Sequence, residues 1–157
     1  MLKKQRDAVK VCEMYRRLGF ACSESVVRAL ADEWNLILPE DFLKEMSIFA
    51  GGAAEDGRCG VLEAGLAVMA NLYSSGLFGN EVSFQELSKL LHHEFEKKYQ
   101  GYLCSDIFYP LYEQMQNNNL NEEDFVCAFH DGITIIMNFL CEKAIKEENI
   151  NYEKEAD

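Results

Sequence analysis

Residues 51–60 read Gly-Gly-Ala-Ala-Glu-Asp-Gly-Arg-Cys-Gly, the one glycine-rich stretch of this chain. Glycine weakens helices and favours turns, so we expect this stretch to separate two helices. On both sides of it, apolar residues recur three and four positions apart, which is the spacing of an amphipathic helix. The stretch also ends on Cys59, which places a thiol at the predicted start of the second helix.

The helical spacing continues through most of the chain. Gly19 and Ser74-Ser75-Gly76 are typical of helix ends, while Ser83 with Glu86 forms the capping-box pattern of a helix start. Five predicted helices cover about residues 8–18, 22–34, 39–49, 59–73 and 83–99. A shorter helix follows from residue 104 and is interrupted or bent near Pro110. A long final helix, capped by Asn121, runs to residue 144. No segment alternates as a strand does. The sequence therefore predicts an all-α fold: a single-domain bundle of six or seven helices over residues 1–146, with a charged, frayed tail over 147–157.

Composition narrows the class of protein. The chain has 157 residues, is 48% hydrophobic and 27% charged, and carries a formal charge of −12. A domain of this size buries roughly 70% of the surface that its unfolded chain exposes, so it needs no disulfides to be stable. The acidity argues against nucleic acid and against an anionic membrane surface as partners.

The start of the chain is charged and has no apolar segment behind it, so we predict no signal peptide and no membrane helix. We therefore expect a cytoplasmic protein. Thiols are kept reduced in that compartment. The six cysteines of the chain therefore point to metal binding, catalysis or redox sensing rather than to static cross-links.

Four of the cysteines are far apart, and the first three fall at predicted helix starts. These candidate catalytic or metal-binding residues are Cys22, Cys59, Cys104 and Cys127. The positive end of a helix dipole favours the thiolate, which is the form that binds metals and attacks disulfides. Cys12 and Cys141 lie inside apolar stripes, and we expect them to be packing residues.

The glycine-rich stretch supplies the candidate cofactor-binding residues Gly51, Gly52, Arg58 and Gly60. Glycines allow close approach of a ligand, and adjacent N–H groups in such a turn can hold an anion or a sulfur. The stretch is neither a P-loop nor a dinucleotide-binding fingerprint, because no Lys-Ser or Lys-Thr follows it and no strand precedes it. We expect Arg58 to lower the pKa of Cys59 or to hold an anionic substrate.

The residues around the histidines indicate structural roles for them rather than catalytic or metal-binding ones. Cys127, His130 and Asp131 share a helix face, as half of a zinc site would, but structural zinc sites usually bring close cysteine pairs. A core helix with a satisfied histidine is the favoured interpretation. His92 and His93 diverge around their helix and lie beside charged residues, so we expect both at the surface.

With these residues in view, the chain resembles the C-GCAxxG-C-C family of redox-active proteins over about residues 19–144. The first cysteine of that family corresponds to Cys22 in Cys-Ser-Glu-Ser-Val, and its glycine-rich stretch and Cys-Gly step correspond to residues 51–60. Its last two cysteines correspond to Cys104 and Cys127. The chain departs from the pattern at Val61, where the family usually has alanine. The resemblance implies an all-helical, redox-active protein.

Two functions follow as hypotheses. In the first, the four cysteines meet and either exchange with disulfides or bind a metal, because four thiolates are a complete ligand set for an iron–sulfur cluster or zinc. A redox partner protein or a small-molecule thiol would then be the reaction partner. In the second, the chain is an interaction protein, such as a homodimer, with buried cysteines. Its partner surface would be aromatic, formed by Phe108, Tyr109, Tyr112, Phe125 and Phe129.

Overall fold

The computed structural model describes residues 2–119 and 129–155, and this part of the chain is all-α, as predicted. Its helices are α1 (Leu2–Arg17), α2 (Cys22–Glu33), α3 (Glu40–Glu45), η1 (Met46–Phe49), η2 (Gly52–Asp56), α4 (Gly60–Ser74), α5 (Phe84–Tyr99), α6 (Cys104–Asn117) and α7 (Phe129–Glu155). Seven of these are α-helices, η1 is a 3₁₀ turn and η2 is one wide turn. The predicted bundle of six or seven helices is confirmed.

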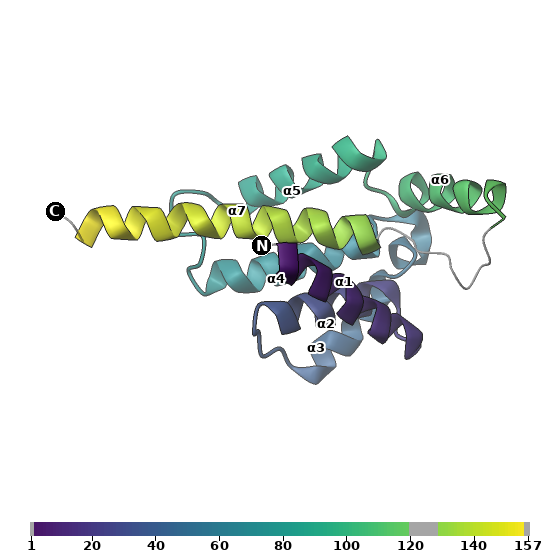
Figure 1. Cartoon of the computed structure of the whole chain (residues 1–157), viewed down its shortest axis with the longest axis horizontal. Coiled ribbons are helices and arrows are strands. Elements are labelled where there is room, and N and C mark those ends of the chain that lie inside the picture. Colours follow the sequence, from purple (N-terminus) through teal and green to yellow (C-terminus); the bar gives the residue numbers. More distant parts are fainter. Residues whose placement is uncertain (1, 120–128, 156–157) are drawn as a thin grey trace.

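The long helix α7 runs through the middle of the molecule (Figure 1). It contacts α1, α2, α4 and α5, and α2 and α4 pack closely on each other. The helix α6 lies at one end, where it contacts the η2 turn. This arrangement brings the glycine-rich stretch, the start of α4 and the start of α6 to the same end of the bundle.

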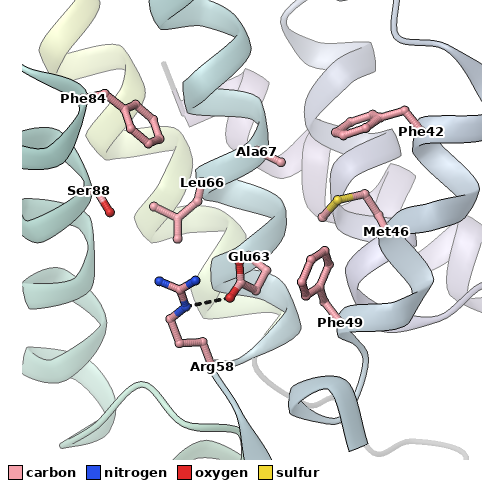
Figure 2. A pocket seen from close by; sticks show the side chains of 9 residues that line it. All are labelled: Phe42, Met46, Phe49, Arg58, Glu63, Leu66, Ala67, Phe84 and Ser88. Atoms are coloured by element: carbon pink, nitrogen blue, oxygen red, sulfur yellow. Dashed lines mark hydrogen bonds and ion pairs between the residues drawn. The ribbon is translucent and has the colours of Figure 1, made fainter.

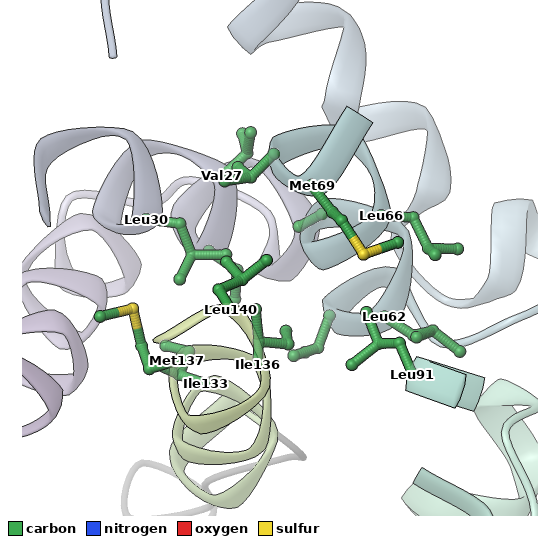
Figure 3. Packing of buried hydrophobic residues seen from close by; sticks show 14 of the residues in the cluster. Val27, Leu30, Leu62, Leu66, Met69, Leu91, Ile133, Ile136, Met137 and Leu140 are labelled. Atoms are coloured by element: carbon green, nitrogen blue, oxygen red, sulfur yellow. The ribbon is translucent and has the colours of Figure 1, made fainter. Parts of the chain in front are cut away.

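The core lies between α2, α4 and α7 (Figure 3). Leu30, Leu62, Met69, Ile136 and Leu140 are each fully buried there. Burying an aliphatic side chain of this size contributes about 1.5–3 kcal/mol, so this three-helix contact holds the bundle together.

Local signals placed several helix ends correctly. Ser83 and Glu86 form the predicted capping box: the Glu86 amide donates to Ser83 Oγ at 3.2 Å, and the Ser83 amide donates to Glu86 Oε2 at 2.9 Å. Gly19 follows α1 with a φ of 92°, a conformation that favours glycine. The helix α6 continues through Pro110 to Asn117, so of the predicted interruption or bend the interruption is wrong, and a bend at Pro110 stays a prediction.

Two predictions about the C-terminal part of the chain stay predictions. Asn121 lies outside the described residues, so its proposed capping role is not seen. The helix α7 extends to Glu155, and fraying of residues 147–157 stays a prediction. Among the described residues, no helix combines the length and the apolar character that crossing a membrane requires.

Candidate functional site: cysteines at three helix starts

Three of the four candidate cysteines begin helices, as predicted. Cys22 is the first residue of α2, Cys104 is the first residue of α6, and Cys59 caps α4. Cys59 is buried, with 3% of its surface exposed, while Cys22 and Cys104 are partly exposed. Cys127, the fourth candidate, lies outside the described residues.

The glycine-rich stretch turns in the left-handed sense. The φ angles of Gly51, Ala53, Ala54 and Asp56 are 65°, 56°, 61° and 53°, and the turn closes where the Gly57 amide donates to the Gly52 carbonyl at 2.8 Å. Such angles cost a residue with a Cβ about 1–2 kcal/mol. Strained backbone of this kind persists only where its surroundings impose it, and it is concentrated at functional sites.

Contacts with the start of α6 impose this conformation. The Cys59 amide donates to the Tyr102 carbonyl at 2.8 Å, and the Cys104 amide donates to the Gly57 carbonyl at 2.9 Å. The Asp56 carboxylate accepts the Ser105 amide at 2.8 Å and the Ser105 hydroxyl at 2.7 Å. The glycine-rich stretch and the start of α6 are therefore one unit, which places Cys59 and Cys104 on adjacent segments.

Glycine allows Cys22 to approach the same unit. A Cβ on Gly60 would lie 3.2 Å from Cys22 Sγ and 2.9 Å from the Phe49 carbonyl oxygen. A Cβ on Gly52 would lie 3.1 Å from the Cys104 Cβ and 2.5 Å from the Gly57 nitrogen. Gly52 and Gly60 thus allow close packing around the cysteines.

The predicted lowering of thiol pKa values at helix starts is wrong for Cys104. Burial raises the pKa of Cys104 above its ordinary value, and the Cys22 thiolate and the Asp56 carboxylate raise it further. Burial is the largest cause, and the helix start itself adds a second one. The amides of Cys104 and Ser105 are already bound by acceptors in the glycine-rich stretch, and one acceptor is the negative Asp56.

The same effect shows that Cys22 and Cys104 are electrostatic neighbours. A thiolate raises the pKa of another thiol only when the two lie close together. Cys22 has this effect on both Cys104 and Cys12. A negative charge on Cys22 therefore opposes the ionisation of Cys104.

The two remaining cysteines differ in environment. Cys12 is fully buried in the core, as predicted, and burial raises its pKa from 9.0 to about 12. Cys141 is partly exposed on α7.

Cys104 opens into a cavity of about 290 Å³. Its lining residues come from the glycine-rich stretch and from the first turns of α6, and they are Gly51, Asp56, Cys104, Ser105, Phe108 and Tyr109. Cys104 is therefore one of the residues that a reagent in this cavity would contact.

Arg58 belongs to a different cavity, of about 370 Å³, between α3, α4 and α5 (Figure 2). Its Nε donates to Glu63 Oε1 at 2.6 Å, and its Nη1 lies 3.4 Å from His92 Nε2. The rest of the lining is mainly apolar, with Phe49 and Phe84 on opposite sides. An effect of Arg58 on the Cys59 thiol stays a prediction.

Sequence reasoning missed three residues of this region. Asp56 and Ser105 are 49 positions apart in the sequence, and no local sequence pattern predicts a contact between them. His92 is partly buried and packs edge-on against Tyr102 with ring centroids 5.2 Å apart, so the expected surface position is correct only for His93.

The two residues of the candidate zinc site that the structure describes, His130 and Asp131, form separate ion pairs. His130 Nε2 lies 2.7 Å from Glu13 Oε1 on α1, and Asp131 Oδ2 lies 3.1 Å from Lys98 Nζ on α5. Over residues 2–119 and 129–155, no three His, Cys, Asp or Glu side chains are grouped to hold a metal ion. A site made of Cys22, Cys59, Cys104 and Cys127 stays a prediction, because Cys127 lies outside these ranges.

Comparison with known protein families places most of the chain in one family. The family described as "Putative redox-active protein (C_GCAxxG_C_C)" matches residues 20–148, which include all four candidate cysteines. No curated protein and no solved structure matches the chain.

Proposed function

The chain belongs to the C_GCAxxG_C_C family of redox-active proteins, and from this premise we propose that it exchanges thiols with disulfides through Cys104 and Cys22. The supporting observations are geometric and electrostatic: Cys22 Sγ packs against Gly60 and Cys104 packs against Gly52 of the same glycine-rich stretch, and the charge of Cys22 raises the pKa of Cys104. Cys104 also lines an open cavity, which makes it the thiol that meets the substrate. Cys59, which is buried beside them, does not take part in the first step.

The reaction runs in two steps. The Cys104 thiolate attacks one sulfur of a disulfide R–S–S–R, the S–S bond breaks, and one R–S⁻ leaves and takes up a proton. The Cys22 thiolate then attacks the Cys104 sulfur and releases the second R–S⁻. The two cysteines lose two electrons and two protons, and the substrate gains them as two R–SH molecules.

The coupling of the two thiols favours this order. While both are reduced, a negative charge on Cys22 raises the pKa of Cys104. Once Cys104 is in a mixed disulfide it carries no negative charge, so it does not repel the Cys22 sulfur that attacks it. The first step therefore facilitates the second.

The test is oxidation of the full-length chain, purified without oxygen, by 2-hydroxyethyl disulfide. Peptide mapping by mass spectrometry should find a Cys22–Cys104 disulfide in the wild-type protein. In Cys22→Ser the reaction should stop at a mixed disulfide on Cys104. Cys141→Ser is the matched control, because it removes a partly exposed thiol from α7 and should leave the product unchanged.

Two outcomes would overturn the proposal. One is a folded protein in which Cys22 and Cys104 stay reduced while the unfolded chain oxidises readily. The other is stoichiometric iron or zinc in the same preparation together with protection of both thiols, which would assign the cysteines to metal binding instead.

A further inference from the structure

We propose that the cavity beside Cys104 selects disulfides that carry a positive charge near the sulfur and discriminates against disulfides that carry a carboxylate. This inference rests on the proposed thiol–disulfide exchange and adds the substrate class. The cavity is defined by Gly51, Asp56, Cys104, Ser105, Phe108 and Tyr109.

The charge of the cavity comes from Asp56. Among the described residues that line it, Asp56 is the one with a formal charge. Its carboxylate is held in place by the amide and the hydroxyl of Ser105, the residue next to Cys104. It is also close enough to Cys104 to raise the pKa of that thiol, which places its charge within reach of a substrate sulfur at Cys104.

No basic side chain offsets this charge within the described lining. The nearest arginine in the sequence, Arg58, pairs with Glu63 and lines the separate cavity of about 370 Å³. The whole chain carries a net charge of −12, so the long-range field also attracts cations. An anionic disulfide thus meets repulsion at long range and again at Asp56.

The remaining walls of the cavity suit a cation. Phe108 and Tyr109 pack edge to face with ring centroids 5.6 Å apart, and Tyr109 is 62% exposed. The face of an aromatic ring attracts an ammonium group. A substrate with a short chain between its sulfur and an ammonium group can place the sulfur at Cys104 and the charge between Asp56 and the rings.

Three symmetrical disulfides that differ mainly in charge provide the test. They are cystamine, which is cationic, 2-hydroxyethyl disulfide, which is neutral, and dithiodiglycolate, which is anionic. The rate of mixed-disulfide formation at Cys104 is measured in the Cys22→Ser protein by mass spectrometry. Each rate is divided by the rate of the same reagent with the urea-unfolded chain, which removes the intrinsic reactivity of the reagent.

We expect the normalised rate for cystamine to exceed that for dithiodiglycolate by about tenfold at low ionic strength, with the neutral reagent between them. The preference should shrink when salt is added, because salt screens exposed charges. Equal normalised rates, or a faster anionic reagent, would overturn the inference while leaving the exchange reaction intact. No reaction of folded Cys104 with any reagent would instead overturn the proposed function.

Asp56→Asn assigns the preference to its source. Asparagine tolerates the left-handed backbone at this position and can still accept the Ser105 amide, so the turn should be retained. The cystamine-to-dithiodiglycolate ratio should fall about threefold or more, even if all three rates rise together because the Cys104 pKa falls. Asp41→Asn is the matched control, since it removes one exposed charge on α3, away from the lining, and should preserve the ratio.

A second variant does not touch the turn. Tyr109→Ala removes an exposed ring and should slow cystamine more than the neutral reagent. If Asp56→Asn and Tyr109→Ala both leave the ratio unchanged, the cavity does not set the charge preference and the inference fails.

Discussion

Cys12 shows at the residue scale how burial couples ionisation to stability. The residue is fully buried, and its pKa is raised from 9.0 to about 12. The unfolded chain therefore loses the Cys12 proton at lower pH than the folded chain. Between these two pKa values the folded state binds more protons, so the free energy of unfolding falls as pH rises.

We predict that stability falls by up to about 1.4 kcal/mol per pH unit above pH 9 because of Cys12. Urea unfolding from about pH 8 to about pH 10.5 measures this slope. The partly exposed Cys104, whose pKa is also raised, adds a smaller contribution of the same sign.

Cys12→Ala separates ionisation from packing. The variant should be less stable than wild type at pH 8, because a buried sulfur is lost, but its stability should fall less steeply with alkalinity. Cys141→Ala should keep the wild-type slope. A Cys12→Ala protein with the full wild-type slope would contradict the assignment.

The start of α5 carries the clearest prediction at the scale of the element. Ser83 and Glu86 satisfy each other's amides, and the backbone and hydroxyl of Ser83 hold the pKa of Glu86 below its ordinary value. Ser83→Ala should lower the free energy of unfolding by about 1 kcal/mol. Chemical denaturation measures the change.

Ser74, the last residue of the preceding helix α4, is the control. The Ser74 hydroxyl donates to the Ala70 carbonyl within α4 and caps no helix start, so Ser74→Ala should change stability by less than about 0.5 kcal/mol. Equal losses for the two variants would show that the capping box contributes nothing specific.

These elements also show how far the sequence could predict the structure. Ser83–Glu86, Gly19 and the three cysteine-led helix starts depend on neighbours within a few residues, and their positions were predictable. The contact of Asp56 with Ser105 depends on how two helices pack, and so does the approach of Cys22 to Gly60. For that reason the sequence placed three candidate cysteines at helix starts but predicted neither the Asp56–Ser105 contact nor the sign of the Cys104 pKa shift.

The course of α6 through Pro110 also depends on how the helices pack. Proline removes one hydrogen bond from a helix interior, and the local rule therefore predicts a break or a bend. The continuous helix buries Ile107 before Pro110 and Met115 after it. Packing on both sides of the proline outweighs the local preference.

At the scale of the whole molecule, the site depends on how closely α4 approaches α7. Gly65 permits this approach, since a Cβ at that position would lie 2.7 Å from Ile136 Cδ1 and 2.8 Å from its Cγ1. The start of α4 also carries Cys59 and Gly60, so a displaced α4 would move the surroundings of Cys22. Global packing and the geometry of the thiols are therefore coupled through one helix.

A double-mutant cycle tests this close approach. Gly65→Ala should destabilise the wild-type protein by about 1–3 kcal/mol, because the added methyl group overlaps Ile136. In an Ile136→Ala background the same change should be neutral or stabilising, because the methyl group fills the new space and alanine favours the helix. Leu140→Ala is the matched background: it also removes a buried side chain from α7, and Gly65→Ala should keep its full cost there. Equal costs of Gly65→Ala in all three backgrounds, measured by urea unfolding, would show that the contact with Ile136 does not set the position of α4.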